Sequence, residues 1–235
     1  MPRAVVRRLL LLLPLLWAGF AWGLDPYVTE PAPALAFSEL PKYISDAVSP
    51  DGIRLLSNTQ EKQTPVCDVW LSKRATLQSS GHPAPDIAYG DIKPGTFVGV
   101  ISILGYREDF QHHLLRPGLY TMRYAQLQQD DDDHAVSPYK DFVILSPAWL
   151  DKDLAAAVPL DELNKRGAVA SHHDEPAAMS LVPVNPAYKK LPAAIADDRG
   201  FCTLQVNLPV EAKGKDSELK FAIIIVRPMW ENEGS

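Results

Sequence analysis

The stretch from Arg116 to Ser146 constrains the fold of this chain more than any other part of the sequence. Its first half, Leu119–Leu127, alternates between two faces with period two, which is the period of a β-strand. The larger and more apolar face, which should point to a core, consists of Tyr120, Met122 and Tyr124. The second half, Asp141–Ser146, is a continuous apolar run of the kind found in strands covered on both sides. We therefore expect an antiparallel hairpin here.

The connection between these two strands, Gln128–Lys140, is unusually long for a hairpin, because most hairpin loops have about 2–5 residues. Long loops are often functional, and this one is rich in charge. We predict a ligand-binding rim at this loop and its stems, with the candidate residues Arg123, Gln128, Asp130, His134 and Lys140.

Four consecutive aspartates, 130–133, lie in this loop. Their mutual repulsion would be relieved by a divalent cation such as Ca²⁺, or by Arg123 or Lys140 from the stems. Consecutive side chains point in different directions, and the loop lacks the D-x-[DN]-x-[DN]-G pattern of calcium loops. A solvated acidic loop tip is therefore the alternative interpretation.

The rest of the sequence predicts further strands and few helices. Strand patterns cover Ile53–Ser57, Val66–Ser72, Thr96–Leu104, Phe201–Leu208 and Leu219–Val226. A short helix is predicted from Ser38, and a second over Trp149–Ala170, interrupted at Pro159. Because strands do not alternate regularly with helices, we predict an all-β fold. The expected form is an antiparallel β-sandwich of about seven strands, with an open barrel as the alternative.

The first 23 residues have the pattern of a secretory signal peptide. Arg3, Arg7 and Arg8 precede an apolar run, Leu9–Phe20, and Ala21-Trp22-Gly23 supplies the small residues of a cleavage site. An uncleaved membrane anchor is the alternative, but the run is short for a spanning helix, which needs about 20 residues. We predict cleavage after Gly23 and a secreted or periplasmic protein. We further expect an extended segment over 24–38, a single domain over 39–230 and a tail over 231–235.

The charge of the chain limits its partners. The formal net charge is −6, and removal of the signal takes away three arginines and no acid. An acidic surface disfavours nucleic acid, which binds clustered Lys and Arg. We therefore expect no nucleic acid, no membrane span after cleavage, and an envelope protein or a small molecule as partner.

Two cysteines, Cys67 and Cys202, fall on inward faces of predicted strands. An oxidising compartment permits a disulfide between them, which would stabilise the fold by about 4–5 kcal/mol in the chain-entropy model. Two buried thiols that never meet are the alternative.

Paired histidines suggest a possible transition-metal site. Imidazoles and carboxylates are suitable ligands, and adjacent histidines in a strand face opposite ways, so at most one of each pair would ligate. The candidate ligands are His112, His113, Asp133, His134, His172 and His173. None of their spacings is a recognised metal signature, and exposed loop histidines are the alternative.

A resemblance accompanies these patterns. The segments are Arg116–Tyr124, then Gln128-Gln129-Asp130 and His134, then Pro138–Phe142, Cys67–Leu71 and Pro94–Val100. They resemble a group of uncharacterised secreted bacterial proteins with the pattern R-P-G-x-Y-T-x-R-Y, Q-x-x-D, H and P-x-x-D-F. Asp131 stands where that group tends to have glycine, so we expect the loop turn to differ. The resemblance implies secretion and a β fold, and it implies no activity.

Together these patterns predict a secreted or periplasmic binding protein without catalytic activity that uses the 128–140 loop. One alternative is a metal-binding protein or metal-dependent enzyme that uses the histidine and aspartate candidates. A structural component of the cell envelope, with the loop as its protein contact, is another.

Overall fold

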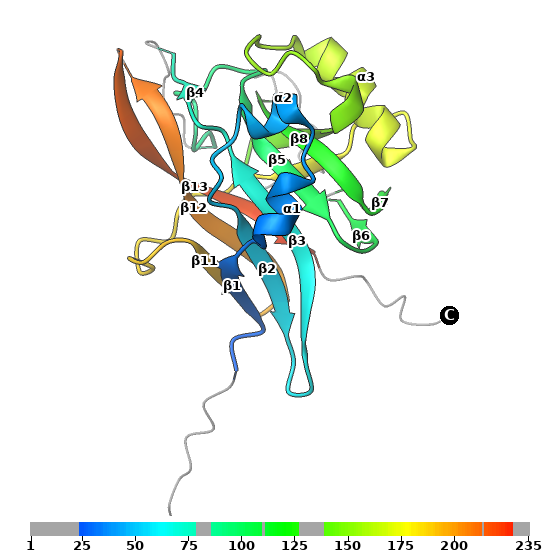
Figure 1. Ribbon diagram of the computed structural model, residues 1–235, viewed down its shortest axis with the longest axis vertical. Helices are drawn as coiled ribbons and strands as arrows, with labels where there is room; N and C mark the ends of the chain where they lie inside the picture. Colours follow the sequence, from blue (N-terminus) through cyan, green and yellow to red (C-terminus); the bar gives the residue numbers. More distant parts are fainter. Residues whose placement is uncertain (1–23, 79–85, 110, 127–138, 213, 228–235) are drawn as a thin grey trace, which may run out of the picture.

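A curled seven-stranded antiparallel sheet organises the fold (Figure 1). The computed structural model describes residues 24–78, 86–109, 111–126, 139–212 and 214–227. In sheet order the strands are β1 (Tyr27–Pro31), β2 (Ile53–Asn58), β3 (Gln63–Leu71), β5 (Phe97–Ile103), β8 (Gly118–Gln126), β9 (Asp141–Pro147) and β10 (Ala178–Ser180). Neighbouring strands in this sheet are all antiparallel.

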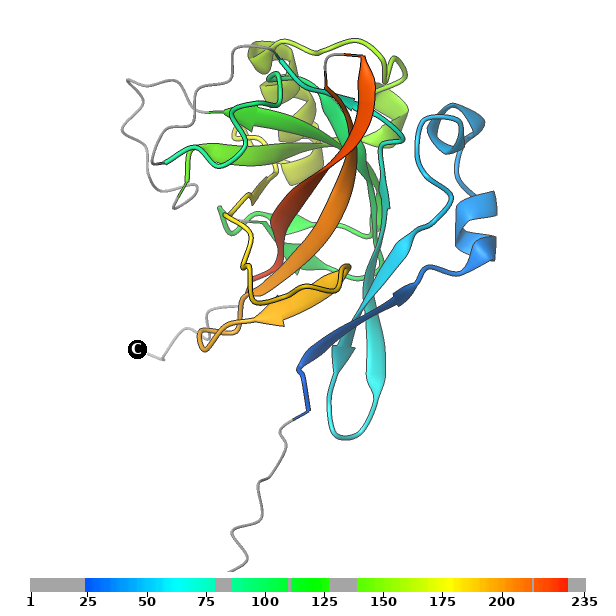
Figure 2. The same cartoon turned by 90° about the vertical axis from the view of Figure 1, so that its left-hand side faces the viewer.

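A second sheet crosses the inner side of the first (Figure 2). It contains β11 (Ala193–Ala196), the long hairpin β12 (Cys202–Ala212) and β13 (Lys215–Val226), and β4 (Ala75–Thr76), which runs parallel to β12. The inner faces of both sheets share one hydrophobic core, in which Leu204, Val206 and Phe221 of the second sheet join Val69, Ile101 and Tyr124 of the first. The prediction of an all-β fold of antiparallel sheets is confirmed. The strand count exceeds the predicted seven because several strands are very short.

The outer face of the large sheet is covered in two places. Helices α1 (Ala34–Ser38) and α2 (Lys42–Ser45) lie over a cluster that contains Trp70, Phe97 and Val100. The turn η1 (Ala148–Leu150) and helix α3 (Leu160–Ser171) follow β9, and α3 packs on Ala125, Phe142 and Ile144. The connection between β5 and β8 forms a small hairpin of β6 (Arg107–Glu108) and β7 (Leu114–Leu115).

The predicted hairpin is confirmed, since β8 pairs antiparallel with β9 from Tyr120↔Pro147 to Gln126↔Asp141. Tyr120, Met122 and Tyr124 face the core as predicted. The other face of β8 is buried too, because α3 and the segment before it cover Thr121, Arg123 and Ala125.

The N-terminal boundary of the domain differs from the expectation. Residues 24–38, expected to be an extended segment before the domain, supply edge strand β1 and helix α1. β1 is held by antiparallel pairing from Tyr27↔Ser57 to Pro31↔Ile53, and Tyr27 packs against the main core. The predicted helix from Ser38 is present as α2, but it begins later, at Lys42, because Ser38 ends α1.

Within the described ranges, no helix has both the length and the apolar character needed to cross a membrane.

Candidate functional site

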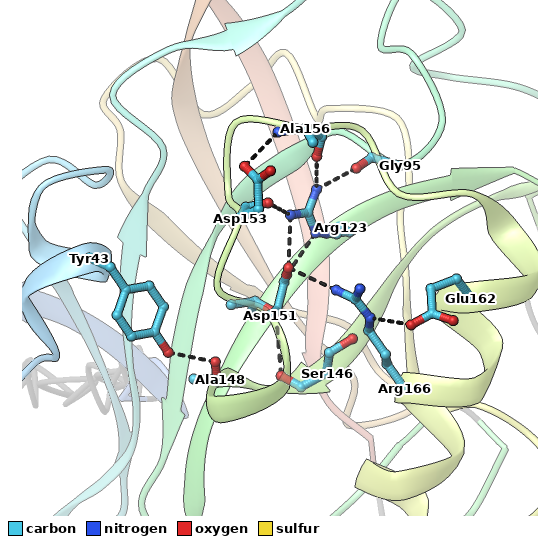
Figure 3. Close-up of polar contacts among 11 residues, drawn as sticks. Tyr43, Gly95, Arg123, Ser146, Ala148, Asp151, Asp153, Ala156, Glu162 and Arg166 are labelled. Atoms are coloured by element: carbon cyan, nitrogen blue, oxygen red, sulfur yellow. Dashed lines mark hydrogen bonds and ion pairs between the residues drawn. The ribbon is translucent and has the colours of Figure 1, made fainter.

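Arg123 is the organising residue of the outer face, and it is fully buried (Figure 3). Its Nε and Nη2 donate to the two carboxylate oxygens of Asp151 at 2.7 and 2.9 Å. The remaining N–H groups donate to backbone carbonyls of Gly95, Ala156 and Asp153, each at 2.7 Å. All five guanidinium donors are therefore satisfied inside the protein.

Arg123 was predicted to bind a ligand, and its burial contradicts that role. Alternation along β8 places it on the face away from the main core, as predicted, but the 151–159 segment closes over that face. Arg123 instead holds the 151–159 segment in place through the carbonyls of Asp153 and Ala156, so it positions this segment and does not contact a ligand itself.

Gly95 is needed where this segment crosses the sheet. It has φ +86°, and a Cβ at this position would lie 2.1 Å from the carbonyl oxygen of Val158. Its own carbonyl accepts from Arg123 and from the Val158 N–H at 3.2 Å. Only glycine permits both the positive φ and this close approach.

A chain of alternating charges leads from Arg123 to the surface. The buried carboxylate of Asp151 also accepts from Nη1 of Arg166 at 3.0 Å, and Nε of Arg166 donates to Glu162 at 2.9 Å. The exposed fraction of these side chains rises from 0% at Asp151 to 22% at Arg166 and 44% at Glu162. The network fixes α3 against the 151–156 segment, because both ends of it are held by charge-assisted hydrogen bonds.

An open cleft of about 650 Å³ lies above this network. We call it the Trp149 cleft, and its lining consists of Trp149, Leu150, Lys152, Asp153, Ala156, Ala157, Val158, Pro159, Glu162 and Arg166. Trp149 is 63% exposed, whereas Trp70 is 1% exposed and belongs to the core. The turn that carries Trp149 is anchored from below, where the hydroxyl of Tyr43 donates to the carbonyl of Ala148 at 2.6 Å.

The charges of the Trp149 cleft are balanced. Lys152 and Arg166 contribute two cations, and Asp153 and Glu162 contribute two carboxylates. The cleft therefore offers hydrogen-bond donors and acceptors around an exposed aromatic face without a net charge.

Of the four histidine candidates in the described residues, His113 and His173 contact each other, and His112 and His172 do not take part in this contact. The rings of His113 and His173 stack with centroids 4.6 Å apart. His112 instead contacts Glu108, with Nδ1 3.1 Å from the carboxylate, and His172 ends α3 in the left-handed conformation. One histidine of each adjacent pair, His113 and His173, therefore lies in this contact, and the metal site itself stays a prediction. Among the described residues, however, no three His, Cys, Asp or Glu side chains are grouped so as to hold a metal ion.

Asp109, which the sequence did not single out, holds His113 in place. Its buried carboxylate accepts from the backbone N–H groups of Gln111, His113 and Ala178 at 2.9, 2.8 and 3.2 Å. It also lies 3.2 Å from Nδ1 of His113. Burial raises the pKa of Asp109, against the opposing effect of these hydrogen bonds.

The base of the predicted binding loop is anchored by Asp141. Its buried carboxylate accepts from the Tyr124 hydroxyl and from the backbone N–H groups of Ala88 and Tyr89. Burial raises the pKa of Asp141 and that of Tyr124. Lys140, predicted as a ligand-binding residue, forms an ion pair with Asp86 at 3.2 Å.

The remaining loop candidates Gln128, Asp130, Asp133 and His134 lie outside the described residues, as do the signal sequence and the 231–235 tail. Cys67 and Cys202 carry free thiols, both buried in the main core. The structure therefore has the two buried, unbonded thiols of the alternative interpretation, and the predicted disulfide is not formed in it.

Sequence reasoning missed Asp151 and Arg166, and it placed Trp149 at the start of the predicted helix Trp149–Ala170. Two signals were present: a tryptophan next to a charged run, Asp151-Lys152-Asp153, and an arginine within an otherwise apolar strand. The second signal implies a buried acidic partner, because a buried arginine is rarely left unpaired.

Comparison of the chain with protein-family models, with curated proteins and with solved structures finds no match.

Proposed function

We propose that this protein binds a neutral saccharide in the Trp149 cleft and does not transform it. The observation that carries the proposal is the exposed indole of Trp149 on a cleft with balanced charge. An aromatic ring exposed at a cleft is a typical anchor for a ligand that has an apolar face.

The polar lining favours a sugar over a charged ligand. A hydroxyl group both donates and accepts, so a pyranose ring can use Lys152 and Arg166 together with the carboxylates of Asp153 and Glu162. A phosphate or carboxylate ligand would require an excess of cations, and the lining has none.

Preorganisation also supports binding. The Arg123 network fixes the floor, and the Asp151–Arg166–Glu162 chain fixes the wall formed by α3. A site held rigidly before the ligand arrives loses less conformational entropy on binding.

Both carboxylates of the cleft already have protein donors: Arg166 for Glu162, and the Ala156 N–H for Asp153 at 3.3 Å. Carboxylates that are fixed by protein donors are suited to orient the hydroxyl groups of a bound ligand. We place the function outside the cytoplasm, as part of the proposal, on the sequence of residues 1–23 alone.

The test is retention of the purified protein on insoluble cellulose, chitin, starch and peptidoglycan, followed by calorimetry with hexasaccharides of the material that retains it. Trp149→Ala should weaken binding by about 30-fold, since truncation of an anchoring tryptophan costs about 2 kcal/mol or more. Tyr106→Ala is the matched control, because Tyr106 is equally exposed at 64% and does not line the cleft. Absence of retention on every polysaccharide, or equal binding by Trp149→Ala, would refute the proposal.

A further inference from the structure

One edge of β13 is open for pairing next to the turn of the β12–β13 hairpin. Figure 1 shows this part of the hairpin on the outside of the molecule. On one side, β13 pairs with β12 from Ala212↔Lys215 onward. On its other side, within the described residues, pairing begins only near its far end, where Leu181 forms an antiparallel bridge to Ile223.

The chain that makes this bridge leaves the edge at once. The N–H of Val182 donates to the carbonyl of Ala222 at 3.1 Å, and the next residue is a proline, which has no N–H. The N–H of Asn185 then donates to the side-chain carbonyl of Gln205 in β12 at 2.8 Å, so the chain has crossed away from β13. The hydroxyl of Tyr89 ends the ladder, because it accepts from the N–H of Ala222 at 2.9 Å and donates to the carbonyl of Val182 at 2.7 Å.

Three residues of β13 present unused backbone groups beyond this point. Both the N–H and the carbonyl of Ala222 point away from β12, and the register of the β12–β13 pair is regular over this stretch. Backbone direction alternates along a strand, so Lys220, Glu218 and Asp216 point their groups to the same side as Ala222. In the described part of the chain, no hydrogen bond reaches the backbone of these three residues from that side. Each offers one donor and one acceptor to an added strand.

An open pocket of about 410 Å³ lies beside this edge. Its lining includes Ile87, Tyr89, Val184 and Leu219, and Leu219 also packs against the main core. Side chains directly opposite each other in paired strands lie on the same face of the sheet. A residue opposite Leu219 would therefore place its side chain in the pocket, and the lining favours an apolar one.

The exposed charges of the edge determine which strand can pair there. Charged side chains on an edge strand discourage indiscriminate pairing, but a partner with opposite charges directly across is stabilised. Lys220 and Glu218 are both exposed. The carboxylate of Asp216 is already paired with Arg74 at 2.6 Å. The suitable partner therefore has an acidic residue opposite Lys220 and a basic residue opposite Glu218.

We propose that an extended segment of a partner protein adds to the free edge of β13 over residues 216–220. The segment runs antiparallel to β13, in continuation of the bridge made by Leu181. Read from its N-terminus, it has an acidic residue opposite Lys220, an apolar residue opposite Leu219 and a basic residue opposite Glu218. Backbone hydrogen bonds supply the affinity, and the pocket with its flanking charges supplies the specificity.

The test measures fluorescence anisotropy of an acetylated probe peptide, Glu-Ile-Lys-Thr-Thr, with a dye at its C-terminus, titrated with the purified protein. We expect saturable binding. Methylation of the backbone nitrogens of the glutamate and the lysine should weaken it by about tenfold or more, because these N–H groups face β13 and two hydrogen bonds are lost. The matched control peptide is methylated at the isoleucine and the threonine that follows the lysine. Their N–H groups point away from β13, so its binding should be unchanged.

Two variants at one position test the edge from the protein side. Glu218→Pro removes an N–H that the β12–β13 pair does not use, so the variant should fold and bind the probe about tenfold more weakly. Glu218→Gln is the matched control, since it keeps the N–H and loses only a cross-strand charge pair, which lowers affinity by about fivefold at most.

Three results would overturn the proposal. The first is absence of saturable binding, and the second is an equal effect of the two methylation patterns or of the two variants. The third is sedimentation of the native protein as a dimer that Glu218→Pro dissociates, which would assign the edge to a second copy. Trp149→Ala should leave peptide binding unchanged, because Trp149 lies in the separate cleft, so this proposal and the saccharide proposal fail independently.

Discussion

Replacement of Arg123 by methionine should destabilise the protein strongly. The guanidinium and its partner Asp151 are both 0% exposed, and methionine fills most of the space without the charge. The change leaves a buried carboxylate without its main partner and removes the donor from three backbone carbonyls.

The magnitude follows from these lost contacts. Breaking a buried ion pair by removing one partner costs about 3–5 kcal/mol. Arg166 still donates to Asp151 at 3.0 Å, which reduces the cost. Each carbonyl left unsatisfied adds about 1–3 kcal/mol if it stays dry, but Asp153 and Ala156 are exposed residues, so water can replace the donor for them. We expect a loss of about 3–5 kcal/mol in the free energy of unfolding.

Equilibrium unfolding in urea, followed by circular dichroism, measures this loss. Arg199→Met is the control, because Arg199 pairs with Asp197 on the surface, and exposed ion pairs contribute about 0–1 kcal/mol. The double variant Arg123→Met, Asp151→Leu should recover much of the loss, since an apolar pair replaces the unpaired charge. A cost for Arg123→Met no greater than that of Arg199→Met would refute the reasoning.

Two further predictions concern buried titratable groups. Burial raises the pKa of Asp141 above its ordinary value of 3.8, so the folded state holds this proton more tightly than the unfolded chain, and stability falls as pH rises from the ordinary to the raised value. Asp141→Asn should abolish that decline in urea melts across this range; an unchanged slope would contradict the assignment. Burial raises the pKa of Cys202 to about 12 and that of Cys67 further, so iodoacetamide should not label the native protein at neutral pH. Rapid native labelling would refute this, and labelling after unfolding without reductant tells free thiols from a bridge.

The strands with clear periodicity could be predicted from the sequence, and the edges of the sheets could not. β8, β9 and β13 were identified from alternation or continuous apolar runs. β1 and β11 were missed because Tyr27–Pro31 and Ala193–Ala196 are only partly buried, so their pairing depends on neighbours far along the chain. The start of α3 after Pro159 was predicted correctly, because proline is favoured at the beginning of a helix, where its missing N–H costs little.

The sequence identified some residues of the site, but not which residues contact one another. Arg123 was predicted as a ligand-binding residue, and Tyr124 and Asp141 as residues of the paired strands; all three form contacts inside the protein. Their partners lie far away in sequence, as Asp151 does from Arg123, and no local pattern connects them. The meeting of His113 with His173 likewise depends on how α3 ends beside the β6–β7 turn.

The Arg123 hub also bears on the order of folding. One guanidinium joins the carbonyl of Gly95 to those of Asp153 and Ala156, and through Asp151 it reaches Arg166 in α3. During synthesis on the ribosome, the floor of the Trp149 cleft therefore cannot form until the chain has extended through α3 and β5 has paired with β8. The cleft therefore matures late, after the central β5–β8 pair of the larger sheet has formed and α3 has been synthesised.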